Sequence, residues 1–253
     1  RSRCRNQIGP RCFERTGTKV RPSVADLGCA ASLRFGAETN TRNMLRSIAA
    51  ALALSAGLWA HAQMGFSIRT VLKNGDFAAL QGQSDVQLQF TYDGMTVGKF
   101  TEENYVKKKT AEYNEKEKGR GDEWAAKWVA ARTEMYEPKF EELLNERLAK
   151  EKLNLKASRN ASGATYFLKV HTTETEPGFN IGITRQPGFV TATITLHEVA
   201  SPEAVLGEVE IQRAPAQTGM GMDFDTGGRI AEGYAKMGKE LGAWLKKSDW
   251  GRK

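Results

Sequence analysis

The chain has 253 residues, of which 40% are hydrophobic and 26% charged, and its formal net charge is +7. Residues 1–62 contain 10 Lys and Arg against 3 Asp and Glu, so residues 63–253 contain 27 of each and are formally neutral. This balance removes the electrostatic argument for a nucleic-acid partner. All three cysteines precede Met44, which excludes disulfides, thiol nucleophiles and Cys-ligated zinc from residues 63–253.

Residues 44–62 have the pattern of a secretory signal peptide. A charged start at Arg46 precedes an apolar run from Ile48 to Trp59, which is too short to remain as a membrane anchor. The run closes with Ala60-His61-Ala62, the small-x-small pattern that signal peptidase accepts. We therefore expect cleavage between Ala62 and Gln63, which would release a protein without a membrane segment into the periplasm or outside the cell.

Residues 1–43 precede this signal and show neither helical nor strand periodicity. Because an export signal acts at the start of a chain, we interpret 1–43 as a disordered upstream extension that is not part of the natural protein. The alternative is a basic arm that binds nucleic acid, which would require 44–62 to be a buried helix. With the signal removed, residues 63–253 are expected to form a single domain.

The mature chain begins with residues 64–84, which we expect to be an irregular lead-in. Residues 86–92 alternate apolar and polar side chains and predict a half-buried strand that ends at Asp93-Gly94. A long helical region follows, with Thr101 as its N-cap and a break at Gly119-Arg120-Gly121. Asp122 is expected to cap a second helix, and Pro138 to kink it or to lie in the first turn of another.

Two tryptophans lie one turn apart on this second helix. Trp124, Trp128, Ala131 and Met135 form one apolar stripe at helical spacing. Large side chains on such a stripe usually anchor a helix to a sheet, and we favour that interpretation. The alternative is a ligand-binding surface on which a sugar ring or a lipid would pack against Trp124 and Trp128.

From residue 164 the period of the apolar pattern becomes two. Three strands are expected, with inward-facing residues Leu168 and Val170, Ile194 and Leu196, and Val209 and Ile211. Because short turns connect these strands, we expect them to form an antiparallel meander with one face buried in the core. Asp225 or Thr226 would cap a last helix that packs Tyr234, Met237 and Leu241 on the sheet, and Gly238 and Gly242 would allow close packing there. The fold class is therefore α+β: an antiparallel-rich mixed sheet, covered on one face by the long helical region and a C-terminal amphipathic helix.

His171 and His197 lie on the polar faces of neighbouring predicted strands. If the hairpin turns near Gly182, His171 lies opposite about residue 193, which leaves His197 too far along the strand to share a metal ion with it. No HExxH sequence, P-loop or serine nucleophile elbow occurs. We therefore expect both histidines to face solvent, and we expect no catalytic residues, metal site or cofactor.

Residues 164–247 resemble the amino-terminal domain of TolB-type periplasmic proteins and the small cell-envelope accessory proteins with that architecture. The resemblance rests on Glu176-Pro177-Gly178-Phe179, on a Gly207 step, and on Asp223-x-Asp225-x-Gly227-Gly228-Arg229-Ile230 at the start of a helix. It implies non-enzymatic docking to envelope proteins or to a second copy. It assigns no binding residue to this chain.

Three functions follow as hypotheses. The leading one is a non-enzymatic envelope protein that acts by protein binding or assembly. Its candidate contact is a sheet edge at Val86–Tyr92, with uncharged Gln87, Gln89 and Thr91, in preference to a second candidate edge at 205–213, which carries glutamates. The second is a carrier of a lipid or glycan on the Trp124 and Trp128 face. The third is a secreted hydrolase, which should show perturbed carboxylates in a cleft.

Overall fold

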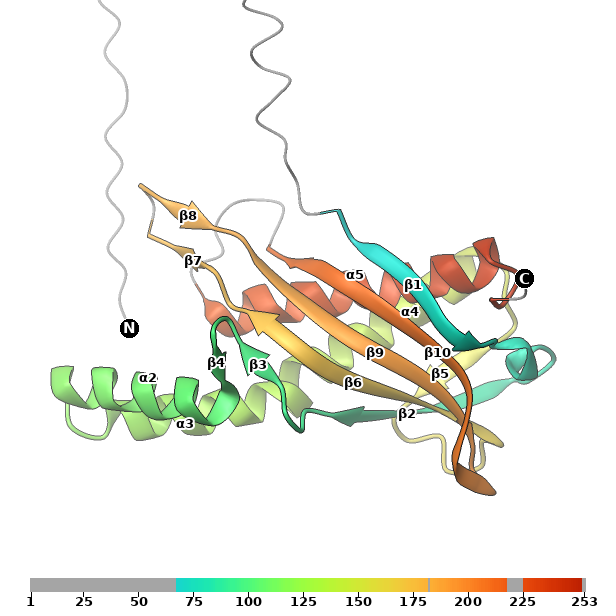
Figure 1. Ribbon diagram of the computed structural model, residues 1–253, viewed down its shortest axis with the longest axis horizontal. Helices are drawn as coiled ribbons and strands as arrows, with labels where there is room; N and C mark the ends of the chain where they lie inside the picture. Colours follow the sequence, from blue (N-terminus) through green and yellow to red (C-terminus); the bar gives the residue numbers. More distant parts are fainter. Residues whose placement is uncertain (1–66, 182, 218–224, 252–253) are drawn as a thin grey trace, which may run out of the picture. The chain divides into compact units, whose positions relative to one another are not determined.

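A computed structural model of the protein describes residues 67–181, 183–217 and 225–251. These residues form an eight-stranded mixed sheet, a separate two-stranded hairpin and a set of helices (Figure 1). The strands are β1 (Arg69–Gly75), β2 (Asp85–Thr91), β3 (Thr96–Val97), β4 (Phe100–Thr101), β5 (Lys156–Ser158), β6 (Tyr166–Glu176), β7 (Phe179–Asn180), β8 (Arg185–Gln186), β9 (Gly188–Glu198) and β10 (Ser201–Ala216). The helices are α2 (Glu102–Lys116), α3 (Arg120–Ala131), α4 (Glu137–Lys150) and α5 (Thr226–Lys247), with a 3-10 turn η2 (Ala78–Leu80) and a π-helical turn η3 (Arg132–Tyr136).

The strand order across the main sheet is β1-β10-β9-β6-β2-β5, and β3 and β4 extend it beside β6. Strands β6, β9 and β10 form the predicted antiparallel meander, whereas β2 runs parallel to both β5 and β6. His171 pairs with Thr193, as the expected turn position predicted. Helices α4 and α5 lie across one face of the sheet (Figure 1). The predicted α+β fold class is confirmed.

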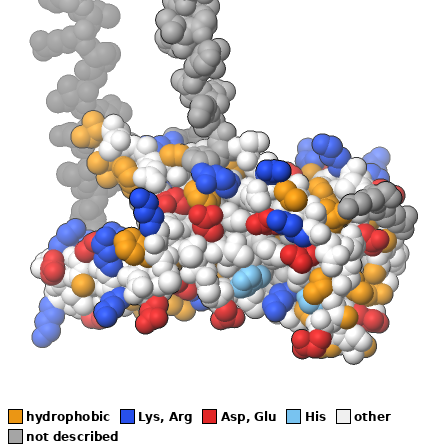
Figure 2. All heavy atoms as spheres, in the orientation of Figure 1, with side chains coloured by type: hydrophobic (Ala, Val, Ile, Leu, Met, Phe, Trp, Pro, Cys, Tyr) orange, Lys and Arg blue, Asp and Glu red, His pale blue; other side chains and the backbone are white. Residues whose placement is uncertain are grey.

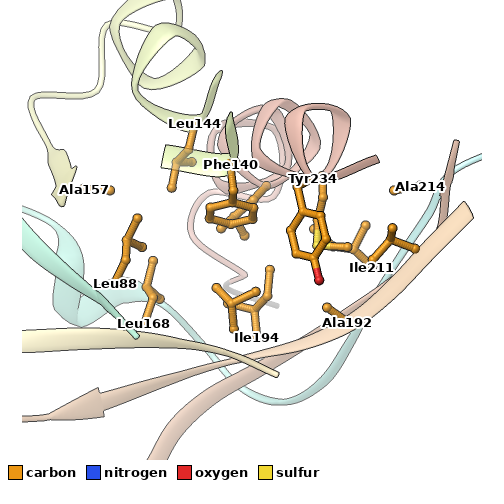
Figure 3. Packing of buried hydrophobic residues seen from close by; sticks show 14 of the residues in the cluster. Leu88, Phe140, Leu144, Ala157, Leu168, Ala192, Ile194, Ile211, Ala214 and Tyr234 are labelled. Atoms are coloured by element: carbon orange, nitrogen blue, oxygen red, sulfur yellow. The ribbon is translucent and has the colours of Figure 1, made fainter. Parts of the chain in front are cut away.

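The core lies between this sheet face and the two helices. The six inward residues predicted from the meander, together with Tyr234, Met237 and Leu241, are all at most 1% exposed. Figure 3 shows Ile194 and Leu168 of the sheet pointing toward Phe140 of α4, with Tyr234 of α5 beside them. Burial of these alternating side chains fixes which face of each strand meets the helices, because a one-residue slip would turn every apolar side chain to the solvent.

The expected irregular lead-in is wrong for residues 69–75, which form β1. This strand pairs antiparallel with β10 from Arg69 opposite Gln212 to Gly75 opposite Gly207. At Gly207 an added Cβ atom would lie 2.1 Å from the carbonyl oxygen of Asp76, so glycine is what lets the chain leaving β1 approach β10. The strand has only seven residues and no clean alternation of burial, which is why periodicity did not reveal it.

Helix α5 begins at the predicted cap, since the Asp225 carboxylate accepts a hydrogen bond from the Gly228 amide. Its glycines Gly238 and Gly242 face α4, not the sheet as expected. A Cβ atom on Gly238 would lie 2.5 Å from the carbonyl oxygen of Phe140, and one on Gly242 would lie 2.9 Å from the Arg147 side chain. These glycines therefore set the close crossing of α4 and α5.

The long helical region contains an antiparallel hairpin, α2 and α3, that extends beyond the end of the sheet near β3 and β4 (Figure 1). Thr101 is the N-cap of α2 as predicted, because its hydroxyl accepts a hydrogen bond from the Asn104 amide. The second helix begins at Arg120, two residues before the cap expected at Asp122. Gly119 has a positive φ of 87°, and Gly121 packs so closely on α2 that a Cβ atom would lie 2.0 Å from the Thr110 carbonyl oxygen.

Candidate functional site

The face of the sheet opposite α4 and α5 carries the polar side chains of each strand, and Figure 2 shows charges of both signs scattered over it. The histidines lie on this face. The Nδ1 atom of His171 is 2.9 Å from the Thr91 hydroxyl, and His197 stacks on the Phe167 ring at a centroid distance of 4.8 Å. His197 is 6% exposed, so the expectation that it faces solvent is wrong. Among the described residues, no group of His, Cys, Asp or Glu has a metal-binding arrangement.

The candidate edge strand β2 lies inside the sheet order. Its residue Gln87 pairs with Phe167 of β6 on one side and with Ser158 of β5 on the other. Gln89 and Thr91 continue the pairing with β6 beyond the end of β5. In the main strand order the outermost strands are β1 and β5, so the prediction of an open edge at Val86–Tyr92 is wrong where β5 covers it.

The other candidate edge, residues 205–213, is also paired on both sides for most of its length. Strand β10 contacts β9 on one side, and β1 covers residues 207–212 on the other. Sequence could not reveal this arrangement, because it depends on β1 and β5, two short strands without a strong apolar alternation.

The two tryptophans hold the helical hairpin together. Trp128 is 6% exposed, and its indole N–H donates a 2.7 Å hydrogen bond to the Glu102 carboxylate of α2. Trp124 packs against Tyr105 and Tyr113 of α2, with ring centroids 6.0 and 5.6 Å apart. The tryptophans therefore have the packing role that we favoured, but they anchor α3 to α2 and not to the sheet as expected.

A groove of about 540 Å³ nevertheless opens beside the tryptophans. Its lining combines their rings with apolar side chains from the end of α3 and the π-helical turn, and with the first residues of α5. Tyr136, in that turn, stacks parallel on Tyr234 at 5.2 Å, and its buried hydroxyl has no hydrogen-bond partner among the described residues. Burial raises the pKa of both tyrosines above the usual range, so the two hydroxyls stay neutral.

A second groove, of about 620 Å³, lies between α2 and the corner where β6 leads into β7. We call it the basic groove. It is lined by Val97, Gly98, Lys99, Phe100, Tyr105, Lys108, Lys109, Tyr113, Glu176, Pro177, Gly178, Phe179, Gln186, Thr226 and Arg229. Four of these residues are cationic, and Glu176 is the one carboxylate among them.

The wall of the basic groove at the β6–β7 corner is held by a buried arginine. Arg229 of α5 is 4% exposed, and its guanidinium donates to the carbonyl oxygens of Pro177 and Gly178 at 3.1 and 3.2 Å. The Glu176 carboxylate accepts a 3.0 Å hydrogen bond from the Gly178 amide. Backbone and side-chain bonds thus fix this corner before any ligand arrives.

Beyond that corner, β7 and β8 form a small hairpin that projects past the main sheet (Figure 1), and we call residues 179–181 and 183–186 the arm. Its large apolar side chains are exposed: Phe179 by 41%, Ile181 by 63% and Ile183 by 97%. Phe100, which also lines the basic groove, is 41% exposed. The arm therefore offers apolar side chains to solvent, directly beside a groove with an excess of positive charge.

Sequence reasoning missed both the arm and the basic groove. The many charged residues of α2 are typical of a solvated helix and by themselves indicate no binding site. The available signal was the position of Lys108 and Lys109, three and four residues after Tyr105 and therefore on the same helical face. The opposing wall comes from residues 176–179 and from Arg229, and only the tertiary fold brings them to α2.

Comparisons with known proteins give only a distant likeness. No family model matches the chain, and no curated protein matches it. Among solved structures, the chain is similar to a PelC dodecamer from Paraburkholderia phytofirmans, with 12% identity, a TM-score of 0.32, and coverage of 68% of this chain and 96% of that one. A point variant of the same PelC in another crystal form gives 11% identity and a TM-score of 0.29, covering 68% and 95%. At these scores the likeness assigns no function.

Within the described residues, no helix has the length and apolar character needed to cross a membrane.

Proposed function

We propose that the protein is exported and acts in the cell envelope by binding a protein partner, which is another envelope protein or a second copy, and not by catalysis. The proposal of export rests on the signal pattern at 44–62, which lies outside the described residues. The predicted resemblance to TolB-type amino-terminal domains supports the same kind of role.

The observation that carries the binding proposal is the arm. Solitary exposed apolar residues are ordinary on protein surfaces, but a contiguous apolar patch usually marks an interaction site. Here Ile181 and Ile183 lie at the tip of a hairpin that pairs only with itself among the described strands, and the exposed rings of Phe179 and Phe100 line the groove beside it. Burial of these side chains against a partner would provide the apolar centre of an interface.

The test compares capture of envelope proteins by the wild-type protein and two variants. Ile183→Asp places a charge at the arm tip, and Val129→Asp places one at another exposed apolar residue, 55% exposed on α3. Both changes should alter the free energy of unfolding by no more than about 0.5 kcal/mol, because both sites are on the surface.

We expect Ile183→Asp to lose a partner that wild type and Val129→Asp retain. Light scattering on the purified protein identifies the case in which that partner is a second copy, since the mass would then fall to that of one chain in Ile183→Asp. Equal capture and equal mass for all three proteins would refute the proposed role of the arm.

A second candidate function is carriage of a small apolar ligand in the groove beside Trp124 and Trp128. The observation that favours it is the groove's volume of about 540 Å³, within the range of small-molecule sites. Titration with palmitate should then change the tryptophan fluorescence, and Met135→Glu, which places a charge in the lining, should abolish the change. A fluorescence that palmitate leaves unaltered would exclude this function for fatty acids.

A further inference from the structure

We propose that the basic groove binds an acidic segment of the protein partner, with an apolar side chain of that segment seated between Phe100 and Phe179. This inference rests on the proposed function, because it specifies the chemistry of the partner that docks at the arm. Its basis is the placement of the groove's cations, its apolar walls and its continuity with the arm.

The cations of the groove exceed its carboxylates. Lys109 forms a 2.7 Å ion pair with Glu112 of the same helix, while Lys108 is 3.9 Å from that carboxylate. The hydrogen bond from Lys109 holds the pKa of Glu112 below its usual range, so Glu112 remains charged. Its single negative charge lies near two lysines and neutralises only one of them. Lys99, which also lines the groove, forms no ion pair within the described part of the chain. A bound segment with two or more carboxylates would complete this set of charges.

The walls of the groove suit an apolar anchor. Phe100 and Phe179 are each 41% exposed, and the Lys108 ammonium lies 4.9 Å above the Phe100 ring. A side chain entering between the rings would bury apolar surface of both, while carboxylates on either side of it would reach the lysines. Burial raises the pKa of Tyr105, which also lines the groove, to about 12, so its hydroxyl remains a neutral hydrogen-bond donor.

A protein segment fits this site better than a free glycan or lipid because the groove is continuous with the arm. Phe179 belongs to both, and Gln186 of the same hairpin also lines the groove. A partner that covers the apolar arm therefore brings its neighbouring residues over the lysines. The resulting interface would have an apolar centre and a charged rim, the usual arrangement in protein complexes.

The experiment selects peptides from a random library displayed on phage, using the wild-type protein as bait. Lys108→Glu with Lys109→Glu reverses two charges inside the groove. Lys107→Glu with Lys118→Glu makes the same change in net charge at exposed positions outside the lining and serves as the matched control. Circular dichroism verifies that both variants fold.

We expect selected peptides to carry net negative charge and at least one large apolar residue. Their affinity should fall about tenfold or more in the groove variant, since two ion pairs are replaced by repulsion, and less than about twofold in the control. It should also fall between about 0.05 M and about 0.5 M NaCl, because rim charges are screened. No enrichment, enrichment of neutral or basic peptides, or equal weakening in both variants would overturn the proposal.

Two further outcomes separate this inference from the proposed function. If the arm variant Ile183→Asp loses its partner but no acidic peptide is selected, docking at the arm stands and the inference fails. If polygalacturonate binds in a manner that Lys108→Glu with Lys109→Glu abolishes, and no peptide is enriched, the groove belongs to an acidic glycan and the inference is wrong. Acidic peptides that still bind Ile183→Asp would support the inference independently of the arm.

Discussion

The crossing of α4 and α5 can be tested by adding a single methyl group. Gly238→Ala would place a Cβ atom 2.5 Å from the Phe140 carbonyl oxygen and 3.0 Å from the Leu144 amide nitrogen. Both are backbone atoms of α4, so the helices would have to separate by about 1 Å to restore normal van der Waals contact. Overpacking of this kind costs about 1–3 kcal/mol, and the higher helix propensity of alanine returns about 1 kcal/mol. Because both close atoms belong to the α4 backbone and cannot rotate away, we take the upper end of this cost, about 3 kcal/mol, and expect a net loss of about 2 kcal/mol.

The matched control is Gly227→Ala in the first turn of the same helix. There the nearest atoms, from the side chains of Asp225 and Met135, are 3.4 Å from an added Cβ, and φ is not positive. This change should stabilise the protein by up to about 1 kcal/mol through helix propensity. Urea unfolding with a check on the m-value measures both effects. A Gly238→Ala protein as stable as wild type, with the same m-value, would show that the two helices do not cross this closely.

Three other predictions concern the core, the helical hairpin and an ion pair. Ile194→Ala should lower the free energy of unfolding by about 2–5 kcal/mol, because Ile194 is fully buried; an unchanged melting temperature would mean that the strand faces are reversed. Trp128→Phe should cost about 1.5–3 kcal/mol by removing the indole hydrogen bond to the charged Glu102 carboxylate, which keeps its ion pair with Arg132; urea unfolding would show this, and no loss would contradict the hydrogen bond. Lys73 donates a hydrogen bond to the Glu210 carboxylate and lowers the pKa of that carboxyl group. The pair therefore stabilises the fold at pH values above the unfolded-state pKa of the carboxyl group, and this contribution is lost as the pH falls through the folded-state pKa. An NMR titration should show a higher pKa for Glu210 in Lys73→Ala, and an unchanged pKa would contradict the pairing.

The meander and its covering helix could be predicted because their patterns are long and regular. Residues 166–176 and 188–198 alternate apolar and polar side chains over many positions, and α5 carries an apolar stripe along its whole length. Burial of one face then fixed both the register and the core residues. Strand β1 shows no clean alternation of buried and exposed residues, and β5 has only three residues, so the edges of the sheet could not be predicted.

The candidate site was missed for a different reason. Its residues belong to α2, to the β6–β7 corner and to the start of α5, and each group has an ordinary local explanation. Lysines on α2 are typical of a solvated helix, and Glu176-Pro177-Gly178 is typical of a turn. Only the fold places them around one groove. The tryptophans, in contrast, stood out in the sequence because of their size, and most of their surface is used to hold α2 and α3 together.

Site-specific photocrosslinking in the producing cells tests most directly whether this end of the molecule is the binding surface. A photoreactive residue, p-benzoylphenylalanine, would replace Ile183 on the arm, Lys108 in the basic groove, or Val129 on α3 as the control. We predict a crosslinked protein adduct at Ile183 and at Lys108, with the same partner in both, and none at Val129. Adducts at Val129 alone, or at all three positions equally, would contradict the account.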